Sequence, residues 1–289
     1  MTVGADFRVR PAVPSDHRQL ANLIHFSPFV HRHLDWRYPL DWIGASPFYV
    51  LESQGQISAT LACPPDPPQV AWVRLFINTG KVPLQESWSI LWDVVRSDIG
   101  AAEGTLIAAI VLQDWLPDLL RLSGFTTRQS IVMLEREGNS LSDLPLGFGF
   151  SIRPMQSIDL PVVAEVDASA FDPLWQNSLQ ALELAFPQAV FPTVAEFKGH
   201  VVGYQISTRN PYGAHLARLA VSPSVQGQGV GRALVAELIQ QTGRHGMSRL
   251  TVNTQSDNFT SLALYTNIGF HETGERFPVY QLSPRPPVV

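Results

Sequence analysis

The chain has 289 residues, a length that suits one large domain or two of ordinary size. Apolar residues make up 45% of it and charged residues 16%, so disorder, collagen and coiled coil are poor interpretations. The net charge of −5 has the wrong sign for a general nucleic-acid binder, and the single cysteine, Cys63, excludes an intrachain disulfide and a cysteine-based metal site.

Hydrophobic periodicity and turn residues predict the same order of elements in each half of the chain. In the first half, strands or helices are predicted at 7–10, 34–43 (helix), 48–52, 57–62, 70–77 and 105–112. In the second half they are predicted at 150–153, 174–184 (helix), 190–196, 201–207, 215–221 and 249–254. Ser15 and Ser157 are the predicted N-caps of the first helices. A hairpin followed by strand–helix–strand crossovers predicts an α+β fold, a mixed, mostly antiparallel sheet flanked by helices.

The sequence contains one internal repeat. Residues 7–11 return at 150–154, and an aspartate follows each at the same spacing. Further matches join 54–56 to 198–200, 72–77 to 216–221 and 124–125 to 269–270, at offsets of 143 to 145. Four ordered matches at a nearly constant offset indicate a duplicated domain. We predict domains at 1–136 and 150–289, with the turn-rich residues 137–149 as the linker.

A glycine-rich turn marks the second half. The strand ending at Val221 leads into Gln226–Gly231, where a helix opens. Helix N-termini offer unpaired N–H groups to phosphates, and glycines allow close backbone approach. A P-loop is excluded because Arg232 follows Gly231, and the same arginine breaks a dinucleotide fingerprint counted from Gly227. The frame that fits is Gln226-x-x-Gly229-x-Gly231.

That frame resembles the coenzyme A pyrophosphate loop of the GNAT acyltransferase superfamily. Residues 258–270 resemble that superfamily's Asn-x-x-Ala/Ser-x-x-Leu-Tyr-x-x-x-Gly-Phe segment, with Asn258, Leu264, Tyr265, Gly269 and Phe270 in place. The opening Ile-Arg-Pro at 152–154 and Asp159 are also usual there. The likeness covers about residues 150–282 and implies two tandem GNAT-like domains, as in the mycothiol synthase type of protein.

The resemblance implies an N-acetyltransferase that moves an acetyl group from acetyl-CoA to a primary amine by direct attack in a ternary complex, without a metal. It implies that Tyr265 protonates the leaving thiolate. It also implies that the residues holding the coenzyme are Leu219, Ala220, Val221, Gln226, Gly227, Gln228, Gly229, Val230, Gly231, Arg232 and Asn258. A core role for Tyr265 is the alternative interpretation.

The base that deprotonates the amine is less clear. His215 stands where the family often has a carboxylate, and a histidine pKa near ~6.5 suits a base at neutral pH. A satisfied strand-end histidine is the alternative, and Glu196, Asp167 and Asp172 are other candidate bases. With Glu165, the two aspartates form either a solvated helix face or a cleft that favours a cationic amine.

Other motifs point to packing. His31 and His33 have a metal-like spacing without a third ligand. Trp36 and Trp42 suit packing better than a substrate cage.

The first half has lost the loop. At an offset of 144 the loop positions fall on 82–87, where Pro83 has no N–H and Glu86 would repel a phosphate. Leu120 replaces the hydroxyl of Tyr265. We therefore expect one coenzyme per chain, held by the second half, while the first half persists for packing.

The remaining expectations concern partners and location. The acceptor is a small-molecule or peptide amine, with a peptide N-terminus, a polyamine, an aminoglycoside and an amino-sugar all open. The chain acts as a monomer (a pseudo-dimer of halves) or a homodimer. A non-catalytic acyl-CoA-binding regulatory module is the alternative function. No leader follows Met1, and the apolar run at 106–112 is too short for a membrane span, so a cytoplasmic protein without nucleic-acid or membrane partners is expected.

Overall fold

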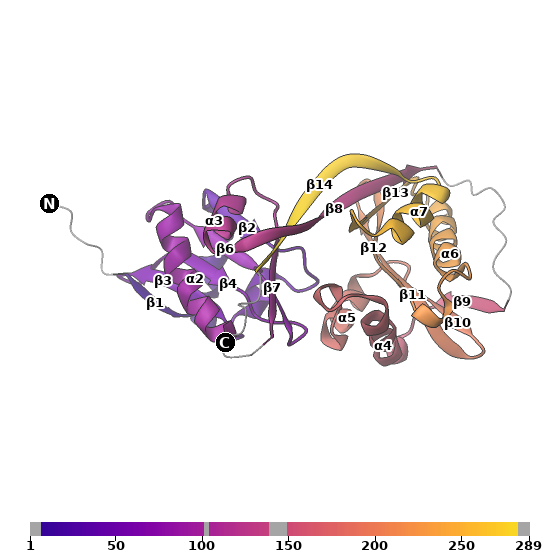
Figure 1. Ribbon diagram of the computed structural model, residues 1–289, viewed down its shortest axis with the longest axis horizontal. Helices are drawn as coiled ribbons and strands as arrows, with labels where there is room; N and C mark the ends of the chain where they lie inside the picture. The colour runs from indigo at the N-terminus through magenta and orange to yellow at the C-terminus, as the bar shows by residue number, and fades with distance from the viewer. Residues whose placement is uncertain (1–6, 101–103, 139–148, 283–289) are drawn as a thin grey trace, which may run out of the picture. The chain divides into compact units, whose positions relative to one another are not determined.

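The computed structural model describes residues 7–100, 104–138 and 149–282. Within them the chain forms two compact units (Figure 1). Unit 1 runs from the N-terminus to Arg128 and takes in the chain again from Pro278, and unit 2 runs from Gln129 to Phe277. The predicted linker falls largely on 139–148, outside the described residues, so the predicted domain boundaries stay a prediction.

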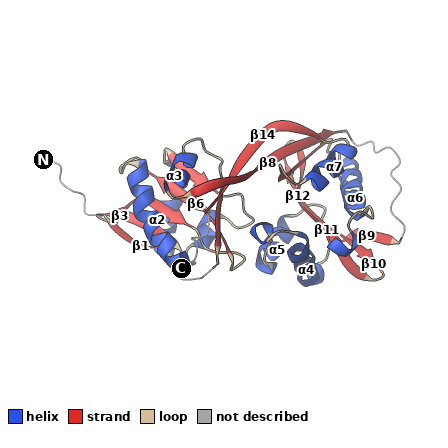
Figure 2. Ribbon diagram, in the orientation of Figure 1, coloured by secondary structure: helices blue, strands red, loops and turns tan. Residues whose placement is uncertain are grey.

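The two halves of the chain follow related orders of elements, coloured by type in Figure 2, and differ mainly between the first helix and the hairpin of each half. The first series is β1 (Arg8–Pro11), η1 (Pro14–Asp16), α1 (His17–Phe26), β2 (Phe29–Arg32), η2 (Pro39–Trp42), β3 (Phe48–Ser53), β4 (Gln56–Ala62), β5 (Val70–Trp72), β6 (Leu75–Asn78), α2 (Leu84–Gly100), β7 (Leu106–Ile110), α3 (Leu116–Leu122) and β8 (Phe125–Glu137). The second is β9 (Phe150–Pro154), η3 (Ser157–Asp159), α4 (Leu160–Ala170), η4 (Pro173–Trp175), α5 (Leu179–Ala185), η5 (Phe186–Gln188), β10 (Thr193–Phe197), β11 (His200–Asn210), β12 (Gly213–Val221), η6 (Pro223–Val225), α6 (Val230–Arg244), β13 (Arg249–Gln255), α7 (Phe259–Asn267) and β14 (His271–Leu282). Here η denotes a 3₁₀ helix.

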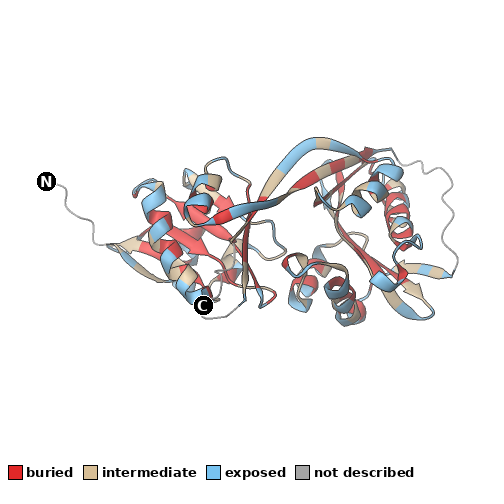
Figure 3. Ribbon diagram, in the orientation of Figure 1, coloured by how far each residue is buried: buried red, intermediate tan, exposed pale blue. Residues whose placement is uncertain are grey.

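Unit 1 is built on two groups of strands. Five strands form a sheet in the order β1-β3-β4-β6-β2, and β5 pairs in parallel with β7, whose other neighbour is β14. The central strands β4 and β6 are buried along nearly their whole length (Figure 3). Trp88, Leu91 and Trp92 of α2 pack into the same buried cluster as Leu61 and Phe76 of these strands. Burial of this apolar face is the main stabilising contribution to the unit.

Unit 2 carries one sheet in the order β14-β8-β13-β12-β11-β10-β9. The pairing of β12 with β13 is parallel, whereas the pairs β9–β10, β10–β11, β11–β12 and β8–β13 are antiparallel. Leu216 and Val252 pack with Leu238 of α6 and Tyr265 of α7, so these two helices cover one face. Helix α4 contacts β11 and β12 through Asp167, on the other face. The mixed sheet flanked by helices confirms the predicted fold class.

Two long strands belong to both units (Figure 1). Strand β8 starts in unit 1, and its part from Ile131 to Glu137 pairs with β13 in unit 2. Strand β14 starts in unit 2, and its last four residues, Val279 to Leu282, pair with β7 in unit 1. Each unit therefore completes its sheet with a strand segment that chain order assigns to the other half.

The repeat is visible in a matched ion-pair corner. Arg10 donates to Asp16 at 2.7 and 2.9 Å and to Glu52 at 2.8 Å. Arg153 donates to Asp159 at 2.7 and 2.9 Å and to Glu196 at 2.8 Å. Two unrelated groups of three residues would rarely share such geometry by chance, so the corner supports duplication.

The predicted serine caps are wrong. Ser15 and Ser157 lie inside η1 and η3, and the capping interaction comes from the aspartates. Asp16 accepts the Val13 N–H at 2.9 Å, and Asp159 accepts the Gln156 N–H at 2.8 Å. A carboxylate already fixed by an arginine is a stronger acceptor than a hydroxyl, which explains the preference.

Two predictions for the first half also fail. Residues 34–43 hold only the short η2, and the strand β2 just before them was not predicted. The predicted strand at 70–77 is split into β5 and β6 around Arg74. Both differences arise from the pairing of β2 with β6, a contact between segments more than 40 residues apart that local pattern does not reveal.

Among the described residues, no helix combines the length and apolar character that a membrane span needs.

Candidate active site

The site is built where two strands of unit 2 diverge. Strands β12 and β13 pair in parallel only from Ala214 to Leu216. Beyond Leu216 no described residue pairs with that edge of β12, although its other edge stays paired with β11 as far as Val221. The register of β11 with β12 shifts between Ile206 and Ser207, which leaves Ala217 as the extra residue of a bulge.

The bulge decides which side chains face which helices. Leu216 belongs to the cluster of α6 and α7, and Leu219 packs against the same cluster. Strict alternation would place residues three apart on opposite faces, so the bulge at Ala217 is what aligns them. Arg218 contacts α4 on the other face. At the point where it separates from β13, strand β12 therefore contacts helices on both faces of the sheet.

The diverging part of β12 has backbone groups to offer. Ser222 donates its N–H to Val202 O at 2.8 Å, which makes this a hydrogen-bonded pair of the antiparallel ladder. Alternation then turns the N–H and C=O of Leu219 and Val221 toward the open edge, while Ala220 bonds within the ladder. The Val221 carbonyl accepts from Gln226 Nε2 at 2.9 Å, which fixes the following loop to the strand.

The loop leads into an uncapped helix start. Gly227 and Gly229 have φ of 77° and 88°, a region that favours glycine, and no heavy atom lies within 4 Å of a Cβ built on either. Gly229 is the N-cap of α6 and makes no side-chain cap bond. The first intrahelical bond runs from Ala233 N to Gly229 O at 2.9 Å, so the N–H groups of residues 230–232 precede it. Such a start can bind an oxyanion.

Gly231 ties this loop to the neighbouring elements. A Cβ at Gly231 would lie 3.4 Å from Leu264 of α7 and 3.7 Å from Val221 of β12. Strand, loop and α7 therefore meet at this glycine. Gln228 and Arg232 are exposed beside it, and the Gln228 amide lies 3.5 Å from Ser224 O.

Tyr265 lies on α7 and is buried. Asn258 caps this helix by accepting the Ser261 N–H at 3.1 Å, so its side-chain oxygen is used structurally. The ring of Tyr265 lies 5.6 Å from that of Phe270 and packs in the cluster that contains Leu216. Burial raises the pKa of the Tyr265 phenol well above its ordinary value. The side chain is 4% exposed and stays protonated over the physiological range.

His215 lies on the opposite face of β12 from this cluster. Its Nδ1 is 2.9 Å from Thr251 Oγ1 on β13. Burial lowers the pKa of His215 below its ordinary value, and the Asn253 side chain opposes this. The imidazole is therefore neutral at pH 7 and able to accept a proton. The sequence reasoning missed Asn253, although it follows Thr251 at the spacing of one strand face.

Asp167 is not part of a solvated helix face. It is fully buried and accepts from Arg218 Nε at 2.7 Å and Arg218 Nη2 at 2.8 Å. It also accepts from the Tyr204 hydroxyl and from Asn177 N. Both oxygens of the Asp167 carboxylate already accept hydrogen bonds from these groups. Asp167 is therefore unsuited to be the catalytic base.

Arg218 and Asp167 together form what we call the clamp, and Arg218 makes two further contacts. It donates to Trp175 O at 2.6 Å and lies 3.6 Å over the ring of Phe171. The clamp fixes α4 and η4 to the sheet beside the diverging strands.

The other acidic candidates have structural partners or lie at the surface. Glu196 accepts from Arg153 in the corner described above. Asp172 is exposed and accepts the Leu174 N–H at 3.2 Å, as the N-cap of η4. Glu165 is exposed on α4. Of the candidate bases, His215 alone combines a neutral acceptor with a place at the strand divergence.

In unit 1 the corresponding edge is occupied by the chain itself. Strand β2 pairs antiparallel with β6, from Phe29 opposite Asn78 to Arg32 opposite Leu75. Strand β6 is the counterpart of the diverging part of β12, because Leu75 and Ile77 precede Leu219 and Val221 by 144 residues. Residues 29–32 correspond in turn to 173–176 of unit 2, where η4 forms instead of a strand.

The segment before α2 is closed as well. Asn78 Nδ2 donates to Val82 O at 3.0 Å and to Ser87 Oγ at 2.6 Å, and its Oδ1 accepts the Gly80 N–H. Asn78 and Ser87 are both fully buried. Leu120 is buried in α3, in the place of Tyr265. The segment has one glycine at positive φ, Gly80 at 81°, but the N–H of Gly80 is bound by the Asn78 side chain, unlike the open glycine loop of unit 2.

The remaining motifs serve packing. His31 Nε2 lies 3.0 Å from Val73 O, and the described residues hold no group of three metal-capable side chains. Trp42 is buried in the core that includes Leu20, with the guanidinium of Arg37 4.0 Å from its ring centroid.

Comparison with known proteins places these features in a family. The model of the acetyltransferase (GNAT) family matches residues 160–270. The N-alpha-acetyltransferase RimI of Mycobacterium tuberculosis is 32% identical over 139 residues, which are 46% of this chain and 85% of that protein. The mycothiol acetyltransferase of Amycolatopsis mediterranei is 28% identical over 169 residues, 51% of this chain and 55% of that protein.

Among solved structures, the tandem GNAT protein from the clavulanic acid biosynthesis pathway aligns with a TM-score of 0.64. The alignment covers 97% of this chain and 99% of that one at 15% identity. At this identity the likeness concerns the fold alone, and it extends over both units.

Proposed function

The chain belongs to the GNAT family of acetyltransferases, in the tandem form, and on that premise we propose that unit 2 transfers an acetyl group from acetyl-CoA to a primary amine in a ternary complex. The observation that carries the proposal is the open edge of β12. It leads directly into the uncapped N-terminus of α6 and borders the cluster that holds Tyr265.

The open edge suits a molecule with amide groups. The N–H and C=O of Leu219 and the N–H of Val221 are available to pair with the pantetheine amides as a further strand would. The pyrophosphate then lies at residues 227–232, where the helix N-terminus and its N–H groups stabilise negative charge. Asn258 stays a prediction for this site, since its oxygen caps α7.

The chemistry follows from two proton transfers. The amine nitrogen loses a proton to His215, directly or through a water, and attacks the thioester carbonyl carbon. The carbon–sulfur bond then breaks, the thiolate takes the proton of the Tyr265 hydroxyl, and the acetylated amine leaves. Each positioned acid or base contributes about 10²–10⁴ to the rate.

The buried environment suits both groups. A phenol of raised pKa always carries its proton, but it gives that proton only to a strong base. A thiolate formed in the same apolar cluster is more basic than a thiolate in water, because burial raises thiol pKa values too. His215 has the opposite need, and its lowered pKa keeps it deprotonated at pH 7.

The relatives point to more than one chemical class of acceptor amine. Relatives named for N-alpha-acetylation and for acetylation of ribosomal protein bS18 alanine point to a peptide N-terminus, and the mycothiol acetyltransferase points to an amine on a small thiol. The carboxylate of Asp167 on α4 is already paired with Arg218 and is not free to bind a cationic acceptor. We therefore infer that other residues recognise such an acceptor.

A direct test uses an acceptor panel with a free-thiol readout. Peptides with a free N-terminal alanine, polyamines, aminoglycosides and amino-sugars are each incubated with acetyl-CoA and the full chain. Mass spectrometry of each product identifies the acetylated nitrogen.

We expect amine-dependent thiol release for at least one class. Coenzyme binding with no amine-dependent release across the panel, in protein of verified folding, would instead favour the non-catalytic binding module.

A further inference from the structure

Unit 1 contains a pocket that the acetyl transfer does not use. Its volume is ≈ 380 Å³, within the range of small-molecule sites. It lies where β2 ends and where the chain leaves β7. Its wall includes Arg32, His33, Leu34, Arg37, Tyr38 and Gln113.

The charges around this pocket are unbalanced. Asp35 is its one acidic wall residue among the described residues, and that carboxylate is held by the buried Arg74. Arg32 has no ion-pair or hydrogen-bond partner among the described residues. The guanidinium of Arg37 lies against Trp42 and makes no ion pair within the same described part of the chain. Two positive charges therefore remain uncompensated in a chain of net charge −5.

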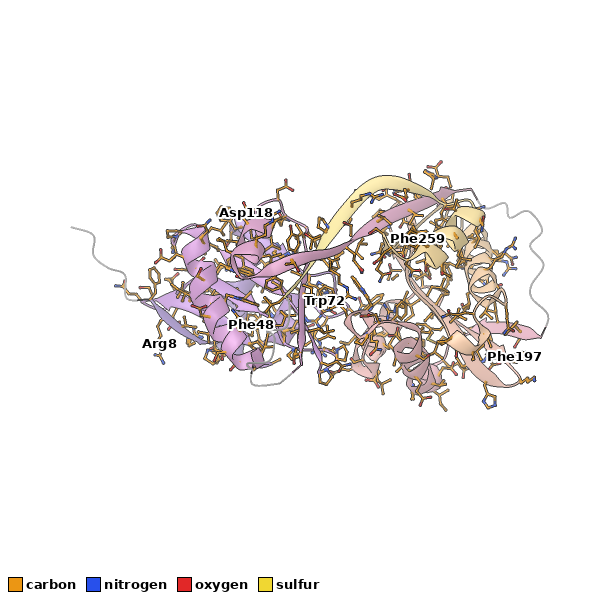
Figure 4. All side chains as sticks on the ribbon, in the orientation of Figure 1. Arg8, Phe48, Trp72, Asp118, Phe197 and Phe259 are labelled. Atoms are coloured by element: carbon orange, nitrogen blue, oxygen red, sulfur yellow. The ribbon has the colours of Figure 1, made fainter. Side chains whose placement is uncertain are left out.

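A neutral histidine lines the same pocket. The His33 ring is stacked on Trp72 at 4.8 Å, with Trp72 labelled in Figure 4. Burial, and then the charge of Arg74, lower the pKa of His33 well below its ordinary value. Its Nδ1 is buried and has no hydrogen-bond partner among the described residues. A buried polar atom without a partner is costly, so its persistence beside a pocket is informative.

The rest of the wall is apolar and partly exposed. Leu34 and Tyr38 are 64% and 75% exposed, unusual values for large apolar side chains that lie four residues apart at one site. Ile24, Val30 and Leu112 also line the pocket and are less exposed. A wall that combines cationic and apolar side chains matches a ligand that combines an anionic group with an apolar body.

Unit 2 lacks these cations. At an offset of 144, Arg32 and Arg37 fall on Gln176 and Ala181. The Gln176 amide instead donates to Ala168 O and Phe171 O, so it makes local contacts. The charged pocket is thus a property of unit 1 and is not explained by the shared fold.

We propose that this pocket is a second ligand site, which binds a small organic anion with a carboxylate or phosphate head and an apolar body. Arg32 and Arg37 pair with the head, since the guanidinium fork matches both oxyanions. Leu34, Tyr38 and Leu112 cover the body. The site is independent of the coenzyme loop in unit 2.

Calorimetry on the full chain with two probes tests the proposal. Benzoate and phenyl phosphate represent the two heads on one apolar body, and benzyl alcohol is the uncharged control. All titrations are made in the Gly229→Glu background as well, so that anion binding at the helix N-terminus of unit 2 is separated from binding in unit 1. The stronger of the two probes identifies the head.

The variants Arg32→Gln and Gln113→Glu, both at exposed wall positions, are each expected to weaken the better probe about tenfold or more. Arg32→Lys should retain part of the affinity, and Arg8→Gln, an exposed arginine of β1 labelled in Figure 4, should leave it within twofold. The proposal is overturned if benzyl alcohol binds as tightly as the anions, if neither anion binds, or if both wall variants bind like the parent.

Discussion

The two units share a fold but treat one strand edge in opposite ways. In unit 2 the edge of β12 beyond Leu216 is open and continues into the glycine start of α6. In unit 1 the equivalent edge of β6 is covered by β2, and the turn before α2 is closed by Asn78. The same scaffold can therefore hold a ligand as a strand or replace that ligand with its own chain.

One pair of arginines shows how the difference is maintained. Arg74 and Arg218 occupy the same repeat position, 144 residues apart. Arg218 finds Asp167 on the first helix of unit 2 and holds η4 through Trp175 O. Ile24 stands in the place of Asp167 in unit 1, at the offset of 143 that relates Asp16 to Asp159. Arg74 therefore pairs with Asp35, and the Arg74 carbonyl accepts the His33 N–H at 2.9 Å. We infer that the carboxylate bound by each arginine determines the fold of the segment after the first helix. In unit 1 that segment is β2, which pairs with β6, and in unit 2 it is η4.

The largest effect is expected at the acid of unit 2. Tyr265→Phe should lower kcat by about 10²–10⁴ with little change in KM for acetyl-CoA, because only the leaving thiolate needs the hydroxyl. Steady-state kinetics with a verified acceptor measure this. Tyr212→Phe, at an exposed tyrosine of the turn between β11 and β12, is the matched control. A kcat within twofold of the parent would remove Tyr265 from the mechanism.

The coenzyme loop should respond next. Gly229→Glu places a side chain at φ 88° and a negative charge at the helix N-terminus, so coenzyme A affinity should fall about a hundredfold or more. Calorimetric titration measures the loss. Gly199→Glu carries the same backbone strain, at φ 80° in the β10–β11 turn, and should bind normally. Equal affinities in the two variants would contradict the assignment.

The base predicts a pH dependence. Protonated His215 cannot accept a proton, so kcat/KM falls as pH falls through its pKa, which burial places below about 6.5. No limb is expected up to about pH 10, since burial raises the pKa of Tyr265. His215→Gln should lower kcat/KM about a hundredfold at pH 7 and flatten the acidic limb.

The control for this profile is His200→Gln, at an exposed histidine of the β10–β11 hairpin, which should keep the parent's curve. An unchanged acidic limb in His215→Gln would assign the base to another group.

The smallest effect is expected in unit 1, where the prediction is no change. The double variant Pro83→Gly, Glu86→Gln removes the two residues that oppose a phosphate, yet β2 still covers the β6 edge. Titration should give one equivalent of coenzyme A per chain, as for the parent. A second equivalent would show that the loop alone, and not the covered edge, had prevented binding.

Local pattern was enough to predict the parts of the site that are contiguous in sequence. The glycine loop, the helix start at Val230 and the placement of Tyr265 on a helix were all foreseen from short motifs. Glycines at positive φ and a capping asparagine act within a few residues, so sequence reveals them.

Long-range pairing was not predictable in the same way. The sequence of residues 29–32 does not indicate that they pair with residues 75–78. The bulge at Ala217 is defined by the register of β12 with β11, which local sequence does not indicate either. The burial of Asp167, by contrast, had a signal. It lies seven residues after Leu160 and four after Val163, on the apolar face of α4, a spacing that places a carboxylate in the core.

The shared strands have a consequence for how the protein is made. The final residues of β14 pair with β7 of unit 1, and most of β8 pairs with β13 of unit 2. During synthesis β7 of unit 1 therefore gains its second neighbouring strand only after the last described residues of β14 have left the ribosome. Severing the chain between β8 and β9 would yield two fragments, each with a strand edge that lacks its partner and is prone to association. The two halves can therefore diverge in chemistry while each still depends on a strand segment from the other.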